Sequence, residues 1–175
     1  MTLSRPLTLL LAAHLLTGCA ARHVAAPTIR EAEATLAKQF ASDGCSADPA
    51  GYLKKNIWNA KRLEIIEPCI TITGVVNAVR PILDGDLHVH LRPDPQFAGL
   101  VNEKNIQARG GNLILEPFCR WAMWRRNSTG PCKNRGYSMR IPKTGTRVRV
   151  TGTFAFDRDH GWNELHPIFK LKPLP

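Results

Sequence analysis

Four side chains that can bind a metal ion recur at strand spacing in two short stretches of the sequence. The stretch DLHVH places His88 and His90 two residues apart, and WNELHP does the same for Glu164 and His166. On a β-strand, residues two apart project from the same face at about 7 Å from each other. Imidazole and carboxylate groups bind a divalent metal such as zinc when they converge from neighbouring strands. If these two strands are adjacent, the four side chains predict a metal site and, with it, a metal-dependent hydrolase.

The same stretches have a simpler interpretation. Histidines on the outer face of a strand are often solvated, and Asn163 and Glu164 can satisfy backbone groups of a turn. The segment DRDHG, residues 157–161, has the Asp and Gly composition of a hairpin turn. No longer motif such as HExxH strengthens the metal interpretation. The metal site is therefore a hypothesis that depends on where the fold places the two strands.

A second candidate is the segment 118–140, in which Trp and Tyr residues alternate with Arg and Lys. Such a composition stacks on bases or sugars while it binds phosphate or carboxylate groups. The alternative is that the tryptophans cover the open end of a barrel and the arginines keep the loop soluble. The residues that we expect to contact a ligand are Trp121, Trp124, Arg125 and Arg126.

Alternating apolar and polar residues predict five strands that position these candidates. The strands are expected at residues 65–83, 86–92, 110–119, 146–156 and 162–171. Gly74 falls where the first, long strand would bend. Two short helices precede them, one over residues 28–45 and one over 48–63, with Asp48 as the N-cap of the second. The pattern favours a mainly β protein with a five-stranded OB-like Greek-key barrel at 64–175 after a helical segment at 28–63, and a two-sheet sandwich is the alternative.

The alternation also predicts which side chains face the core. In the second strand the apolar residues point inward and His88 and His90 outward. In the fourth strand Arg147, Arg149, Thr151 and Thr153 are expected outside. In the fifth, we expect Leu165, Phe169 and Leu171 inside, and Glu164, His166 and Lys170 outside.

The chain begins MTLSRPLTLLLAAHLLTGC, a basic start followed by an apolar run and small residues. The ending Leu-Thr-Gly-Cys resembles the lipobox of bacterial lipoproteins. That resemblance implies loss of residues 1–18, lipidation of Cys19, a tether at 19–27 and membrane attachment through the lipid. Ala20 after the cysteine implies the outer membrane, with the domain facing the periplasm. The alternatives are an ordinary cleaved signal peptide and a buried first helix.

Charge and cysteine content fit an exported protein with anionic partners. Cleavage would take only Arg5 from the 24 basic side chains, which leaves 23 against 14 acidic ones. Such an excess favours phospholipid headgroups, acidic glycans or nucleic acid, although a merely solvated basic surface has the same composition. Four further cysteines predict two disulfides with three possible pairings. These cysteines are Cys45, Cys69, Cys119 and Cys132.

The body of the chain resembles small uncharacterised exported bacterial domains with an OB-like barrel. The resemblance rests on DGDLH, GGNLILE, GTRVRVTG and DRDHGWNELHP, and it covers Cys69 to Phe169. It implies a fold but no established activity. The residues that it marks for testing are Asp86, His88, Trp162, Asn163, Glu164 and His166.

These observations favour a binding function over catalysis. The sequence has no nucleophile elbow, phosphate loop or internal repeat. The leading hypothesis is a lipid-anchored envelope module for an anionic polymer or a protein partner. The alternatives are the metal-dependent hydrolase and a structural lipoprotein without a soluble ligand. Nucleic acid is a disfavoured partner because an exported protein meets envelope polymers first.

Overall fold

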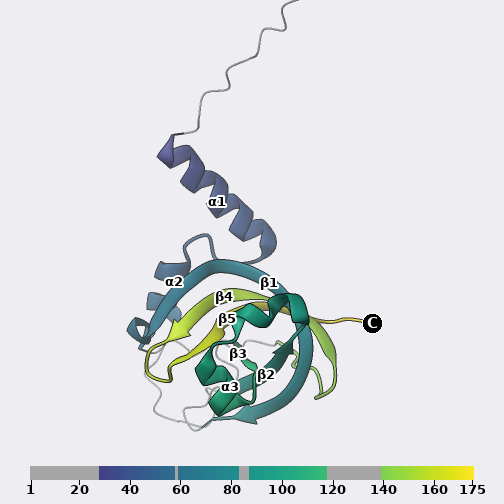
Figure 1. The fold of residues 1–175 in the computed structure, drawn as a ribbon. Helices are drawn as coiled ribbons and strands as arrows, with labels where there is room; N and C mark the ends of the chain where they lie inside the picture. Colours follow the sequence, from purple (N-terminus) through teal and green to yellow (C-terminus); the bar gives the residue numbers. More distant parts are fainter. Residues whose placement is uncertain (1–27, 58, 83–86, 118–138) are drawn as a thin grey trace, which may run out of the picture.

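The computed structural model describes residues 28–57, 59–82, 87–117 and 139–175 (Figure 1). Some residues named above as candidates lie outside this part of the chain: Cys19, Asp86, Cys119, Trp121, Trp124, Arg125, Arg126 and Cys132. The elements follow in the order α1 (Ile29–Asp43), α2 (Pro49–Asn56), η1 (Ala60–Arg62), β1 (Leu63–Pro81), β2 (Leu87–Pro93), η2 (Pro95–Leu100), α3 (Glu103–Arg109), β3 (Leu113–Pro117), β4 (Arg147–Asp157) and β5 (Trp162–Pro173).

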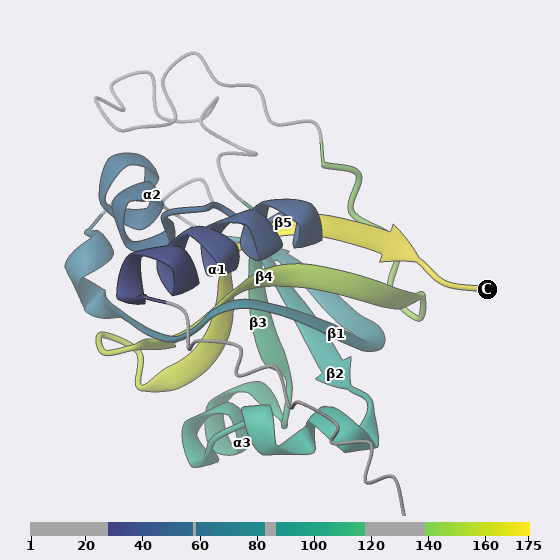
Figure 2. The same cartoon turned by 90° about the horizontal axis from the view of Figure 1, so that it is seen from above.

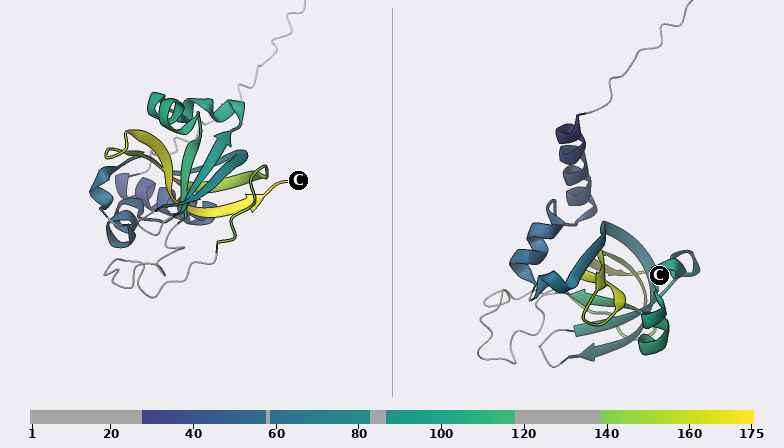
Figure 3. Two further views of the ribbon diagram at one scale, coloured as in Figure 1. Left: turned by 90° about the horizontal axis from the view of Figure 1, so that it is seen from below. Right: turned by 60° about the vertical axis from the view of Figure 1, so that its left-hand side comes forward.

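Two helices precede the sheet, as the sequence predicts. The α1 helix begins with a reciprocal cap, in which Thr28 and Glu31 bond each other's backbone N–H groups. The α2 helix begins with the Asp48 carboxylate accepting from the backbone N–H of Gly51 at 3.0 Å. It ends at Asn56, earlier than the predicted residue 63, because the chain turns and re-forms as the 3₁₀ turn η1. Helix α1 projects away from the sheet (Figures 1 and 3).

The five strands form one sheet that closes on itself in the order β1-β2-β3-β5-β4, with β4 returning to β1. All neighbours are antiparallel except β3 and β5, which are parallel. Strand β1 is long enough to pair with both β2 and β4, and Gly74 lies opposite a residue of each. A Cβ atom there would lie 2.4 Å from the carbonyl oxygen of Arg92, so only glycine allows the close approach. The protein is therefore mainly β with five strands and a few short helices.

Apolar side chains from all five strands fill the interior. The side chains of Val76, Val89, Leu91, Leu113 and Leu115 are 0 % exposed. Leu87 joins them, so the inward residues of β2 are as predicted. Burial of each such side chain contributes about 1.5–3 kcal/mol to folding, which makes this core the main source of stability and a firm support for polar groups around it.

Several side chains that the alternation places outside are buried. His88 and His90 are 5 % and 7 % exposed, and Glu164 and His166 are 0 % and 3 % exposed. Arg62 and Trp162 pack beside Glu164. These polar side chains therefore form a buried region on the outer face of the sheet, separate from the apolar core. Thr151 and Thr153 are buried too, and they hydrogen bond to Thr71 and to the carbonyl of Pro68 in β1.

The prediction that Phe169 faces the core is also wrong. The pairing of β4 with β5 shifts on both sides of Gly152, which lies opposite Ile168. Ile168 is 1 % exposed and occupies the core in its place. Phe169 instead packs edge-on against Tyr52 of α2, with ring centroids 5.4 Å apart. A local register shift exchanges the two faces of a strand, so alternation beyond it misassigns the side chains.

Helix α3 was not predicted and lies on the opposite side of the sheet from α1 (Figure 2). It begins with a capping box between Asn102 and Asn105 and ends at Gly110 in the left-handed conformation. Asn105 is fully buried and bonds the backbone of Asn112 and Asn163, which fixes the helix to the start of β5.

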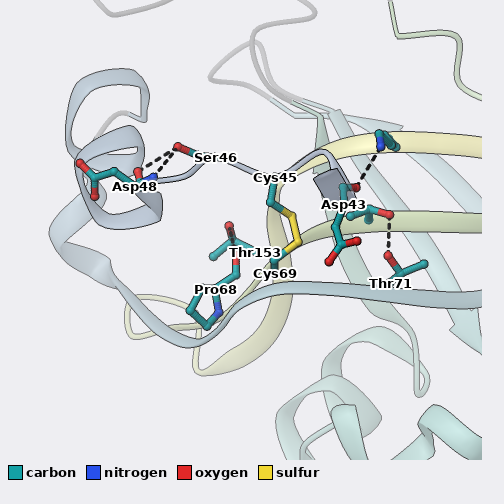
Figure 4. The surroundings of a disulfide bond; sticks show 10 residues. Asp43, Cys45, Ser46, Asp48, Pro68, Cys69, Thr71 and Thr153 are labelled. Atoms are coloured by element: carbon teal, nitrogen blue, oxygen red, sulfur yellow. Dashed lines mark hydrogen bonds between the residues drawn. A yellow bond between two sulfur atoms is a disulfide. The ribbon is translucent and has the colours of Figure 1, made fainter. Parts of the chain in front are cut away.

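A disulfide joins Cys45 to Cys69, one of the pairings that the sequence allows, and ties the segment after α1 to β1 (Figure 4). Beside it, the Lys170 ammonium donates to the carbonyl oxygen of Asp43 at 3.0 Å. Among the helices in the described ranges, none is sufficiently long and apolar to cross a membrane.

Candidate functional site

A cluster of charged side chains is buried where η1 meets β2, β3, β4 and β5. We call it the buried cluster and define it as Arg62, His88, Glu116, Asp157, Glu164 and His166. Their side chains are between 0 % and 11 % exposed. Charges in such a setting persist only when they are paired with one another.

Strand register brings these residues together. In the parallel pair, Leu115 lies opposite Leu165, so the side chains of Glu116 and His166 follow on the same side. In the antiparallel pair, Val89 lies opposite Leu115, which places His88 across from Glu116. Leu63 lies opposite Asp157, so Arg62 enters from the turn just before β1. Residues from five elements thus converge without any local sequence motif.

His166 lies between two carboxylates. Its Nδ1 atom is 2.9 Å from Oε2 of Glu116 and 3.0 Å from Oε1 of Glu164. Burial by itself would lower the pKa of His166, but the charge of Glu116 and the hydrogen bonds of both carboxylates raise it to about 10. The imidazole is therefore protonated at neutral pH and forms a buried ion pair.

The two glutamates differ in their electrostatics. Burial would raise the pKa of Glu116, but the charge and hydrogen bonds of His166, together with His88, hold it well below its usual range. Burial and the negative charge of Glu116 raise the pKa of Glu164. The indole N–H of Trp162 donates to Oε2 of Glu164 at 2.9 Å and fixes that carboxylate. One glutamate thus carries the main negative charge, and the second holds a proton more readily.

Arg62 supplies a fixed positive charge on the other side of these carboxylates. It pairs with Asp157 and lies 3.5 Å from Oε1 of Glu164 and 3.8 Å from Oε2 of Glu116. Asp157 also accepts the backbone N–H groups of Asp159 and His160. The segment DRDHG is therefore a turn, as its composition indicates, and its first residue also belongs to the buried cluster.

The structure brings together three of the four predicted metal ligands and separates the fourth. His88, Glu164 and His166 belong to the buried cluster, and Glu116, which sequence reasoning missed, links them. His90 faces basic groups instead. Burial and the charges of Arg109, Arg80 and His88 lower the pKa of His90 to about 4. Its imidazole is therefore neutral and lies in a positive environment.

The geometry favours a different metal-ligand set from the predicted one. Within the described residues, Glu116, Glu164 and His166 offer ligand atoms that all lie within 4.8 Å of one another. A signal for Glu116 was present in the sequence, because it is the one charged residue in the apolar strand LILEP. A lone acid in a buried strand needs a partner, and the register then identifies His88.

Trp162 forms the outer wall of the cluster. The ring of His160 stacks on it at 4.2 Å with planes 6° apart, and the guanidinium of Arg109 lies 3.9 Å above the ring. Asn163 bonds Asn105 of α3 and the carbonyl of Leu100. Trp162 and Asn163, both candidates for ligand contact, therefore support the fold at this end of β5.

A second polar region lies on the outer wall of the sheet. Val75 of β1 lies opposite both Arg92 and Arg147, and Arg149 lies opposite Lys172. Directly opposed residues share a face, so these cations point outward together with Lys170. We call this surface the basic face and define it as Arg92, Arg147, Arg149, Lys170 and Lys172, all of which are exposed. Arg147 and Arg149 are outside, as predicted.

No protein-family model, curated protein or solved structure matches this chain. The function must therefore be argued from the two polar regions themselves. One of them is closed and paired, and the other is open to solvent.

Proposed function

We propose that this protein is a binding module of the OB type that holds an anionic polymer against its basic face. The strand order β1-β2-β3-β5-β4 with parallel β3 and β5 supports the fold assignment. Barrels of this type bind oligonucleotides and oligosaccharides. The envelope location rests on the resemblance of the N-terminus to a lipobox, with Cys19 as the lipid anchor.

The observation that carries the proposal is the arrangement of cations on adjoining strands. Neighbouring strands lie about 4.8 Å apart and residues two apart in a strand about 7 Å, so the basic face is on the order of 15 Å across. In the part of the chain that the structure describes, Arg92, Arg149 and Lys172 form no ion pair with an acidic side chain. A surface with several exposed cations suits an extended ligand with repeated negative charges.

Cross-strand pairing strengthens this interpretation. Arg149 and Lys172 are directly opposite each other, and like charges in that position destabilise a sheet. The pair therefore costs folding free energy, and an anion that bridges the two cations would recover that cost. The buried cluster offers less for a reaction on a large substrate, because the side chains of Glu116, Glu164 and His166 are 3 %, 0 % and 4 % exposed. Their burial favours binding over hydrolysis.

The test is binding of the full-length protein to fluorescent dextran sulfate, followed by anisotropy over a range of salt concentrations. The Arg149→Thr/Lys172→Thr variant keeps strand-forming residues and removes two cations. The matched control is Lys54→Ala/Lys55→Ala, which removes two exposed cations from α2. We expect the strand variant to bind the polymer about five- to tenfold more weakly, because each exposed ion pair contributes up to about 1 kcal/mol to binding and two are lost. Its affinity should also depend less steeply on salt.

Two results would contradict the proposal. If the parent does not bind the polyanion at low salt, the binding function is wrong. If the α2 control weakens binding as much as the strand variant, overall charge and not the basic face attracts the polymer. Unchanged binding in the control with a clear loss in the strand variant would support the basic face as the site.

A further inference from the structure

We propose that Glu116, Glu164 and His166 form a structural site for one divalent transition-metal ion, for which zinc and cobalt are the probes. The inference is independent of polymer binding, because the buried cluster and the basic face share no residue. It rests on the positions of the ligand atoms, on the charge balance of the cluster and on the polar contacts that orient the ligands.

The ligand atoms lie close to the positions that a metal would require. With metal–ligand bonds of about 2.0–2.2 Å in a tetrahedral site, neighbouring ligand atoms are about 3.3–3.5 Å apart. Nδ1 of His166 lies 2.9 Å from one Glu116 oxygen and 3.0 Å from one Glu164 oxygen. An opening of about 0.3–0.6 Å at these two contacts would admit an ion in place of the proton on Nδ1, and all three ligand atoms already lie within 4.8 Å of one another.

Charge balance allows a dication in place of two protons. Asp157, Glu116 and Glu164 are three buried carboxylates, and among the described residues Arg62 is the guanidinium that pairs with them. When all three acids are ionised, the set carries a charge of about −2 before any imidazole is protonated. Two protons or one divalent ion neutralise that charge. A dication neutralises the charge without a proton shared between His166 and the two glutamates, because all three side chains then bind the metal directly.

The surroundings resemble the outer shell of a metal site. Oε1 of Glu116 is buried, and Nε2 of His88 lies 2.9 Å from it, a contact that orients this carboxylate. The Trp162 indole N–H holds the outer oxygen of Glu164, and Arg62 lies beside both carboxylates. Such outer contacts orient ligands, and their loss typically weakens metal affinity about 10–100-fold.

The ligands also match the chemistry of transition metals. One imidazole with two carboxylates suits zinc, cobalt, manganese or iron better than calcium, which prefers six to eight oxygen ligands. Burial of all three side chains leaves the site closed, as in structural sites that stabilise a fold. The ion would tie β3 to β5 at their one parallel pairing.

The experiment uses the full-length protein, purified without a polyhistidine tag and treated with chelator. Cobalt is titrated in and the ligand-field absorption recorded, and the midpoint of thermal unfolding is measured with and without zinc. We expect one equivalent of cobalt to bind with a tetrahedral spectrum and zinc to raise the midpoint. Trp162→Phe should weaken affinity about 10–100-fold, and Glu116→Gln or Glu164→Gln should weaken it further.

A histidine variant is the matched control. His90→Gln removes the buried imidazole that strand spacing pairs with His88. This variant should keep cobalt affinity within about threefold of the parent, well below the loss expected for an outer contact. An equal loss in this control and in the glutamate variants would place the metal elsewhere and overturn the proposal.

The parent protein decides the question even if the glutamate variants do not fold. Absence of cobalt absorption together with an unchanged midpoint in zinc would show that the cluster is an ion-pair network only. X-ray absorption of the zinc-loaded parent should show one imidazole among oxygen ligands. Two or more imidazoles would also overturn the assignment, because His166 is the single histidine in the set.

Discussion

In the buried cluster each charged side chain lies beside an opposite charge, whereas on the basic face Arg92, Arg149 and Lys172 extend from adjoining strands toward solvent. Both regions occupy the outside of the same sheet. The cluster is covered by Arg62 and by Trp162 with its stacked partners, while the five cations of the basic face are exposed. Coverage and the presence of opposite charges therefore separate the two regions.

The difference in dielectric environment determines what each region can do. An ion pair at 4 Å is worth about 1 kcal/mol in water and about 4 kcal/mol at the effective dielectric of a partly buried site. Charges in the cluster therefore bind one another, and changes there affect the fold. Charges on the basic face interact weakly within the protein and are available to a ligand.

The largest effect is expected from Arg62→Ala. Removal of the guanidinium leaves Glu116, Asp157 and Glu164 buried without their fixed counter-charge. Breaking a buried pair in this way destabilises a protein by about 3–5 kcal/mol. Urea unfolding of the parent and the variant measures the loss.

The matched control for Arg62 is Arg158→Ala. Arg158 pairs with Glu64 at 2.9 Å, but the two side chains are 59 % and 55 % exposed. Exposed pairs contribute about 0–1 kcal/mol. Equal losses in both variants would contradict the distinction between the buried cluster and the exposed surface.

A pH-dependent effect is expected from the buried histidines. His166 has a pKa of about 10 in the folded chain against an ordinary value of 6.5. Its proton therefore stabilises the fold fully below about pH 6.5, and the contribution is lost as pH rises toward 10. His90 behaves in the opposite way, because its pKa is lowered to about 4. Its effect is a loss of stability as pH falls from about 6.5 to 4.

Urea unfolding of the chelator-treated protein at a series of pH values tests both directions. The decline above pH 6.5 should shrink in His166→Gln and persist in His90→Gln. The decline between about pH 6.5 and 4 should shrink in His90→Gln. Parallel curves for the parent and His166→Gln above pH 6.5 would show that the imidazole does not hold a proton in the folded cluster.

Much of the fold follows from local patterns in the sequence. Alternation locates all five strands and the inward residues of β2, and Asp48 is the predicted N-cap. The pairing of Cys45 with Cys69 is among those that the cysteine count allows. These features depend on neighbouring residues or on the period of one strand, which a single sequence contains.

The candidate site follows from the sequence only in part. Alternation shows that His88 and His90 share a face, but it does not show that Trp162 covers one and that Arg80 and Arg109 surround the other. The role of Glu116 depends on the parallel pairing of β3 with β5, in which Leu115 lies opposite Leu165, fifty positions later in the sequence. Local patterns cannot specify contacts of that kind, since they result from the order of the strands.

The smallest effect, and the only gain in stability, is expected from the cross-strand pair on the basic face. Lys172→Thr removes one of two cations that lie directly opposite each other on β4 and β5. Relief of that repulsion should raise the free energy of unfolding by about 0.2–1 kcal/mol at low salt. The gain should vanish near 1 M salt, where charges are screened beyond about 3 Å. A loss of stability at low salt would show that the fold itself needs Lys172, and it would remove the reason to assign the pair to a ligand.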